Sequence, residues 1–195
     1  MWFNKTLNLG VFVVAAAYGQ TSQSECVSVT VNGAPGIHPT TLAMAKETAT
    51  RLFAEVGVSV ELNYFVPRKA GSCVAIALGF DASSNSAFHP GALAYAEPFR
   101  NGGTQIHVFT DRIVMGDRRS DGKLLGYVIA HEIGHVLELI SRHSAGGIMK
   151  ANWRDADYSE IRSGRLHFAP EDAQLIHQGF ARRKAAAAVL TANSR

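Results

Sequence analysis

Alternating apolar and polar positions predict a series of short strands in the first half of the chain. The segment 27–31, Val-Ser-Val-Thr-Val, is rich in β-branched residues and is followed by Asn32-Gly33, a pattern typical of a strand that ends in a turn. Residues 81–91 are rich in Ser, Asn and Gly and are predicted to form a loop. Two further strands are predicted at 58–64 and 73–80, a short extended piece at 92–96, and another strand, again by alternation, at 104–110.

Apolar residues spaced three or four positions apart predict three helices. The first begins at Pro39 and ends before Gly57. The second covers about 121–139, after a polar turn in which Ser120 or Asp121 is available as the helix cap. The third begins at Pro170, with acidic residues in its first turn. Residues 141–168 show no strong period and are predicted to be irregular. The apolar residues expected to bury these helices are Leu42, Ala45, Ala49, Leu52, Phe53 and Val56 in the first, and Ala173, Leu175, Ile176 and Phe180 in the third.

This order of elements predicts a mixed α/β fold, with a twisted sheet of about five strands, two main helices and a small irregular C-terminal part that ends in a helix. A chain of 195 residues, 47% hydrophobic and 18% charged, has the composition of a globular protein. We expect a single domain over 20–195, divided into an N-terminal subdomain of about 26–140 and a C-terminal subdomain of about 141–195.

The first 19 residues have the pattern of a secretory signal peptide. Lys5 precedes a short apolar run over 7–17, and Ala17-Tyr18-Gly19 supplies the small residues of a cleavage site. The run is too short to span a bilayer, so a stable membrane anchor is not expected. We predict export to the periplasm or the extracellular space, with a mature chain that starts near Gln20 and carries no inhibitory prodomain.

Export affects the interpretation of the two cysteines. Cys26 and Cys73 are an even pair in an oxidising compartment, which favours one disulfide. The alternative is that Cys26 coordinates a metal as an inhibitory thiolate. The formal charge of +3 is small, and the basic run at 182–184 is more typical of a solvated helix end than of a nucleic-acid-binding surface.

The second helix carries the candidate chemistry. Its apolar stripe consists of Leu125, Ile129, Ile133, Val136 and Ile140. The pair His131 and His135 lies roughly 140° from the centre of that stripe, at 100° per residue, and is therefore expected to face a different surface, such as the wall of a cleft.

Histidines at positions i and i+4 of a helix can share one tetrahedral zinc ion. Glu132, between them, can reach water at the metal without binding the metal itself, which is what a general base requires. The third ligand is predicted to be His143, beyond the helix end, and the alternatives are the later acids Asp155, Asp157 and Glu160. Glu138 shares the face of His131, but seven residues of helix rise about 10 Å, which is too far for one ion.

The segment 131–153, HEIGHVLELISRHSAGGIMKANW, resembles the metzincin metallopeptidases, and especially a metzincin-like set of bacterial exported proteins. The resemblance implies that His131, His135 and His143 bind zinc and that Glu132 is the base. It also implies that Met149 lies in a tight turn beneath the metal. We therefore expect a zinc-dependent endopeptidase that acts on peptide or protein substrates.

The resemblance extends to the order of elements from about residue 26. It implies a five-stranded sheet with an antiparallel edge strand at 92–96 bordering the cleft. It also implies that the first and third strands are neighbours, which would let Cys26 and Cys73 meet. The sequence departs from the family in two ways. His143 follows His131 by twelve residues rather than ten, and Leu139 occupies the region of the usual helix-ending glycine. A leucine at positive φ costs about 1 kcal/mol or more.

Other functions remain open from the sequence. The same fold could be an inactive zinc-binding or interaction module, or a gluzincin-type hydrolase with a downstream acidic ligand. Without the histidines, Met149 is typical of a core residue, and Trp153 could either pack beneath the turn or line a substrate pocket. The remaining histidines have no partner spacing and are expected to be ordinary; they are His38, His89, His107, His167 and His177. The sequence gives no oligomeric state.

Overall fold

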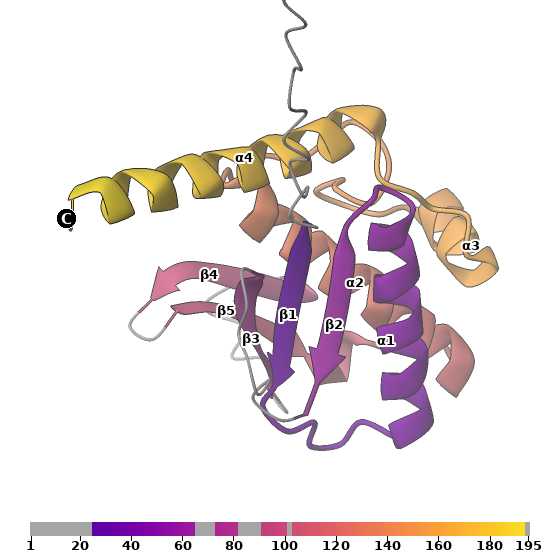
Figure 1. Ribbon diagram of the computed structural model, residues 1–195. Helices are drawn as coiled ribbons and strands as arrows, with labels where there is room; N and C mark the ends of the chain where they lie inside the picture. Colours follow the sequence, from indigo (N-terminus) through magenta and orange to yellow (C-terminus); the bar gives the residue numbers. More distant parts are fainter. Residues whose placement is uncertain (1–24, 65–72, 82–90, 101–102, 194–195) are drawn as a thin grey trace, which may run out of the picture.

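The computed structural model describes residues 25–64, 73–81, 91–100 and 103–193. The proposed signal peptide, most of the predicted loop at 81–91 and His89 lie outside these residues. Five strands form a mixed sheet in the order β2-β1-β3-β5-β4 (Figure 1). Their bounds are Cys26–Val31 for β1, Ser59–Asn63 for β2, Val74–Asp81 for β3, Ala94–Arg100 for β4 and Gly103–Phe109 for β5.

The described residues also form four α-helices, which accompany the sheet. They are α1 (Pro39–Ala54), α2 (Arg118–Glu138), α3 (Asp155–Ser163) and α4 (Pro170–Asn193). A short 3-10 turn at Thr110–Arg112 follows β5. In Figure 1, α4 crosses the end of the sheet where β1 begins. None of the described helices combines the length and the apolar character that a membrane crossing requires. The mixed α/β class and the five strands agree with the prediction.

The strand pairing agrees with the expected topology. The strands β1, β2, β3 and β5 are parallel, and β4 pairs with β5 in the antiparallel direction as the edge strand. β1 lies between β2 and β3, with Val27 opposite Val74. This pairing brings together Cys26 and Cys73, which form a disulfide with Cα atoms 4.7 Å apart. The disulfide indicates an oxidising, extracytoplasmic environment.

One hydrophobic cluster joins the sheet to its helices and also includes residues of the predicted C-terminal subdomain. The strands contribute alternate residues because successive side chains point to opposite faces. Members of the cluster from different parts of the chain are Val29, Leu78 and Ile106 from the sheet, Phe53 and Ile129 from the helices, and Ile148, Ile161 and Ile176 from beyond residue 141.

The helix α2 begins three residues earlier than predicted. Its cap is Asp117 rather than Ser120 or Asp121, and Asp117 Oδ1 accepts hydrogen bonds from the backbone N–H groups of Arg119 and Ser120, each at 3.0 Å. Asp121 instead accepts a hydrogen bond from the Met115 N–H at 2.6 Å. The turn was predicted correctly, but three polar residues could serve as its cap, and tertiary contacts decide which one does.

The prediction that α2 buries only one stripe was wrong. Most of its residues are buried, from Gly122 to Glu138, and Ile140 lies beyond the helix with 37% of its surface exposed. Gly122 and Gly126 let α1 approach closely, because a Cβ atom at either position would lie 2.8 Å from an α1 carbonyl oxygen. The helix is therefore a central element, and its histidines emerge where the surrounding elements leave a cleft.

The region 141–168 is less irregular than predicted, because it contains α3. This helix has few apolar residues, and only Ile161 is fully buried. It begins where the Asp157 side chain accepts the backbone N–H of Arg154 at 2.8 Å and ends at Gly164, which has φ +77°. A short, mostly exposed helix of this kind is stabilised by its ends and has no strong hydrophobic period.

Candidate metal centre

The end of α2 places the third candidate ligand beside the first two. Leu139, the residue after the helix, has φ 61° and ψ 20°, the left-handed conformation in which a leucine is strained. The chain turns there and brings His143 back toward the helix. The ligating atoms of His131, His135 and His143 all lie within 4.8 Å of one another. Among the described residues, no other group of histidines, cysteines or acids could hold a metal in this way.

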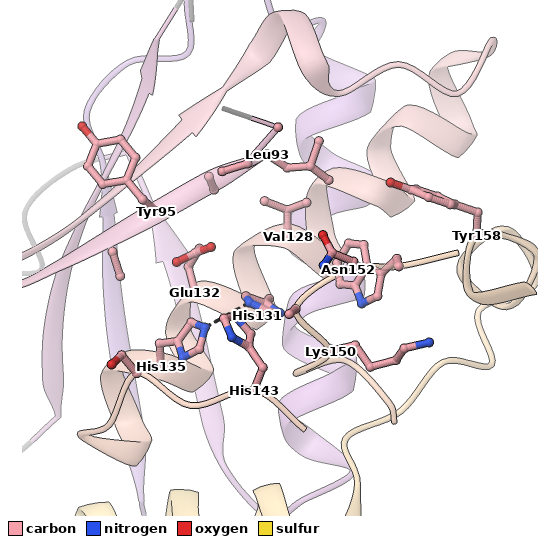
Figure 2. Close-up of a pocket in the computed structure, with 17 residues that line it drawn as sticks. Leu93, Tyr95, Val128, His131, Glu132, His135, His143, Lys150, Asn152 and Tyr158 are labelled. Atoms are coloured by element: carbon pink, nitrogen blue, oxygen red, sulfur yellow. Dashed lines mark hydrogen bonds between the residues drawn. The ribbon is translucent and has the colours of Figure 1, made fainter. Parts of the chain in front are cut away.

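The histidine pair has its free nitrogens directed at one point (Figure 2). The Nε2 atoms of His131 and His135 are 3.0 Å apart. His131 Nδ1 donates to the carbonyl oxygen of Ile148 at 2.8 Å. Because a carbonyl can only accept, Nδ1 carries the proton, and the Nε2 lone pair is left free for a cation. A backbone carbonyl of this kind fixes both the tautomer and the orientation of a metal-binding imidazole.

The pKa values of both helical histidines favour the neutral form. Burial lowers the pKa of His131 to about 4, with a further contribution from His135. Burial, together with His143, lowers the pKa of His135 to about 4. Zinc requires neutral imidazoles. The donor set therefore fits zinc: three nitrogen ligands, two of them already neutral near pH 7, with room for a fourth ligand.

Glu132 lies beside the histidine cluster without joining it. Its side chain is 7% exposed and lines a cavity of about 490 Å³ together with the three histidines. A second cavity of about 330 Å³ also includes Glu132 and His135. Burial raises the pKa of Glu132 to about 8, and a bound cation would favour its ionised form. The position is suitable for a group that exchanges protons with a substrate in the cleft.

The cleft is bordered by the edge strand. The larger cavity is lined by residues 91–96 on one side and by residues 150–153 and Tyr158 on the other. Figure 2 shows Leu93 and Tyr95 opposite the histidines. β4 begins at Ala94 and continues to Arg100, so it starts later and extends further than the predicted segment 92–96, with an irregular register between Glu97 and Arg100.

Met149 packs against the helix that carries His131 and His135. It is fully buried, and a Cβ atom on Gly134 would lie 2.5 Å from its sulfur. Gly134, one of the two residues between Glu132 and His135, lies against Met149. The sequence pattern could not distinguish this position from ordinary core filling, because both require a buried methionine.

Trp153 both packs against the turn and lines the cavity, so the two alternatives are not exclusive. Its Nε1 donates to the Ile148 carbonyl at 3.2 Å, the same oxygen that binds His131. Its ring lies edge-on to that of His131, with centroids 5.9 Å apart. The role of the Ile148 carbonyl was not predicted, because a main-chain acceptor leaves no sign in a sequence. The cavity-lining residues Lys150, Asn152 and Tyr158 were also missed.

The alternative ligands have other contacts. Asp157 pairs with Lys150 and receives the backbone N–H of Arg154. Neither Asp157, Asp155 nor Glu160 joins the histidine cluster. Glu138 is buried and faces Arg142, at 3.9 Å from its Nε atom. Cys26 is in the disulfide, so it is not a thiolate ligand.

The four other histidines that the structure describes lie outside the cluster and make other contacts. His167 pairs with Glu55 at 2.7 Å, and His177 pairs with Glu25 at 2.5 Å. His107 stacks on Tyr95, with ring centroids 4.9 Å apart. In addition, His38 is the N-cap of α1.

No family model matches the chain, and no curated protein matches it. Among solved structures, it is similar to the archaemetzincin of Methanopyrus kandleri, with a TM-score of 0.49 and 13% identity over 83% of this chain and 98% of that one. It is also similar to the archaemetzincin of Archaeoglobus fulgidus complexed with malonate, with a TM-score of 0.48 and 15% identity over 77% and 99%. The interpretation of the site therefore depends on the chain's own residues.

Proposed function

We propose that this protein is an exported zinc-dependent endopeptidase. The observation that carries the proposal is the convergence of His131, His135 and His143 in a cleft that also contains Glu132 and is bordered by an edge strand. The three imidazoles would hold the ion and leave a position open, which is the arrangement of catalytic rather than structural zinc sites. When bound, zinc supplies the Lewis acidity that polarises a peptide carbonyl and activates water.

Glu132 supplies the proton transfers. Its carboxylate oxygen takes a proton from the attacking water as the new C–O bond forms. The same carboxyl then gives that proton to the leaving nitrogen as the C–N bond breaks. The burial of Glu132 supports this role, because a carboxyl with a raised pKa both accepts and returns a proton near neutral pH.

The strand β4 orients the substrate. It is an edge of the sheet, and its first residues line the cavity beside the histidines. An extended peptide can add to such an edge through main-chain hydrogen bonds. This mode selects an unfolded or extended segment and leaves specificity to the side-chain cavities on either side of Glu132.

Hydrolysis of casein, measured with the wild type and with Glu132→Gln, tests the proposal. We expect the wild type to cleave casein and to lose this activity with a chelator. Glu132→Gln should retain zinc and lose about 10²- to 10⁴-fold in rate, the usual contribution of a general base. The exposed Glu61→Gln is the matched control and should behave as the wild type. Equal cleavage by Glu132→Gln would exclude Glu132 as the base.

The same samples separate the alternatives. A wild-type protein that holds zinc and cleaves no unfolded protein would favour the non-enzymatic module. Zinc binding that persists unchanged in His143→Ala would favour a downstream acidic ligand, as in the gluzincin alternative.

A further inference from the structure

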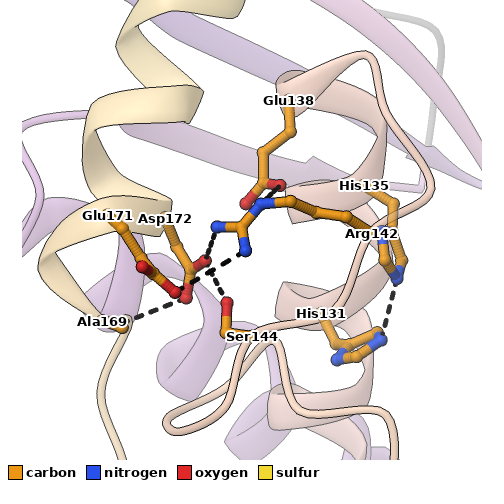
Figure 3. A network of polar contacts seen from close by, with 8 residues as sticks. All are labelled: His131, His135, Glu138, Arg142, Ser144, Ala169, Glu171 and Asp172. Carbon is orange, nitrogen blue, oxygen red and sulfur yellow. Dashed lines mark hydrogen bonds and ion pairs between the residues drawn. The ribbon is translucent and has the colours of Figure 1, made fainter.

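The residues on either side of His143 are both held by one carboxylate of α4 (Figure 3). Arg142 Nη2 donates to Asp172 Oδ1 at 2.7 Å, and Ser144 Oγ donates to the same oxygen. Asp172 is fully buried, and Ser144 is 8% exposed. Two anchors to a single rigid helix therefore flank the third candidate ligand.

Asp172 is itself held in place. Its Oδ2 accepts the backbone N–H of Ala169 at 3.3 Å, and its own N–H donates to the Ala169 carbonyl at 2.9 Å. It lies in the first turn of α4, where the helix dipole favours a negative charge. Burying a carboxylate is costly unless it is paired and hydrogen-bonded. A buried carboxylate without partners would therefore destabilise the fold, and the contacts of Asp172 with Arg142, Ser144 and Ala169 offset this cost.

Arg142 has two further acidic neighbours. Its Nε lies 3.9 Å from Glu138 Oε2, and its Nη1 lies 3.6 Å from Glu171 Oε1. Glu171 is 58% exposed and Glu138 is buried. The guanidinium thus connects the end of α2 to the start of α4 across the segment that carries His143. The hydrogen bond from Ser144 N–H to Met149 O, at 2.8 Å, closes the loop beyond it.

The connection matters because the segment between the ligands is long. His143 follows His131 by twelve positions, and the last five of these, from the strained Leu139 onward, lie beyond the end of α2. Without fixed ends, such a segment would lose conformational entropy each time a metal bound. Fixing residues 142 and 144 leaves the imidazole between them with few positions to adopt.

We propose that Asp172 is the positioning residue for the third metal ligand, acting through Arg142 and Ser144 on His143. The proposal rests on the proposed zinc site and goes beyond it, because it assigns part of the metal affinity to a helix that provides no ligand. The removal of partners that orient metal ligands typically lowers metal affinity about 10- to 100-fold.

The test is zinc affinity, measured by competition with a chromophoric chelator, for the full chain and its variants. Asp172→Ala should bind zinc about 10- to 100-fold more weakly than the wild type. Glu171→Gln is the matched control, since it removes the neighbouring exposed carboxylate that also faces Arg142. It should change the affinity by less than about twofold, as expected for a surface ion pair.

A double substitution separates positioning from general stability. If Asp172 acts through His143, Asp172→Ala should weaken zinc binding by less than about twofold when His143→Ala is already present. A purely structural role would lower the unfolding temperature and weaken binding equally in both backgrounds, which would overturn the proposal. Unchanged zinc affinity in a folded Asp172→Ala protein would also overturn it.

The less disruptive variant Ser144→Ala tests the proposal if Asp172→Ala does not fold. It removes one anchor and leaves the ion pair, so a smaller loss of affinity is expected, again only with His143 present; an unchanged affinity would overturn the proposal. A wild-type chain that binds no zinc would refute both this proposal and the proposed function. A wild-type chain that binds zinc but cleaves nothing would refute the peptidase alone.

Discussion

The contact between Gly134 and Met149 predicts that substitution of Met149 reverses the sign of the effect of Gly134→Ala on the free energy of unfolding. In the interior of a helix, alanine is favoured over glycine by about 1 kcal/mol. In the wild-type protein, however, a Cβ atom at position 134 would lie 2.5 Å from the Met149 sulfur and 3.0 Å from its terminal methyl carbon. Because Met149 is fully buried, its side chain has little room to move aside, and overpacking of this kind costs about 1–3 kcal/mol. Gly134→Ala should therefore destabilise the wild type by about 1 kcal/mol in net terms.

Removal of the methionine side chain should reverse this effect. Met149→Ala alone should cost about 2–5 kcal/mol, because the side chain is fully buried. In that background the new methyl group at position 134 meets only ordinary contact with Phe168 at 3.6 Å. Gly134→Ala should then stabilise the protein by up to about 1 kcal/mol, which gives a coupling of about 2 kcal/mol between the two positions.

Urea unfolding of the four proteins, in the presence of a chelator, measures this coupling. The chelator removes any contribution of metal binding to the free energy of unfolding. Gly146→Ala is the control, since a Cβ atom there would meet open space, and its effect should be the same in both backgrounds. If Gly134→Ala changes the free energy of unfolding by the same amount and sign with and without Met149, the methionine does not pack against α2 as described.

Three further predictions concern the fold around the site. Leu139→Gly should leave the free energy of unfolding within about 1 kcal/mol of the wild type, because relief of the left-handed strain offsets the greater freedom of glycine in the unfolded chain. A larger loss in urea unfolding would show that the leucine side chain stabilises the fold by more than its strained backbone costs. Replacing Cys26 and Cys73 by serine should cost about 4 kcal/mol in the loop-entropy model for a separation of 47 residues, and an unchanged melting temperature would contradict it. Burial would raise the pKa of Asp157, but hydrogen bonds from Lys150 and a backbone N–H outweigh it and hold this pKa below its ordinary 3.8. The stability difference between wild type and Asp157→Asn should therefore be complete above that pH and disappear as the pH falls through the lowered value, and a difference that persists in acid would refute the assignment.

Much of the fold could be predicted from the sequence because its signals are local. Local sequence patterns placed a segment at each of the five described strands, although β4 extends four residues beyond the predicted segment 92–96, and the second cysteine is adjacent to the strand that pairs with β1. The helix α3 was missed because its stability depends on capping at Arg154 and Gly164 rather than on an apolar stripe. The surroundings of α2 were missed because periodicity does not show how many elements pack around a helix.

The candidate site was predictable to a similar extent. The spacing of His131 and His135 indicates a shared ion, and the absence of a helix-ending glycine indicated the strain that the structure places at Leu139, which has the left-handed conformation. The sequence could not show the Ile148 carbonyl or the contact of Asp172 with Arg142, because these pairs are set by tertiary packing. Sequence spacing identifies candidate ligands, and distant residues decide how firmly they are held.

Zinc titration of the purified protein is the most direct test of the central claim that three imidazoles hold one ion. We predict one zinc per chain in the wild type and in His167→Ala, whose exposed imidazole pairs with Glu55. His143→Ala should lose at least about 100-fold in affinity, the upper range for disturbing a zinc site from outside its ligands. A wild-type protein without zinc, or His143→Ala with undiminished affinity, would contradict the account.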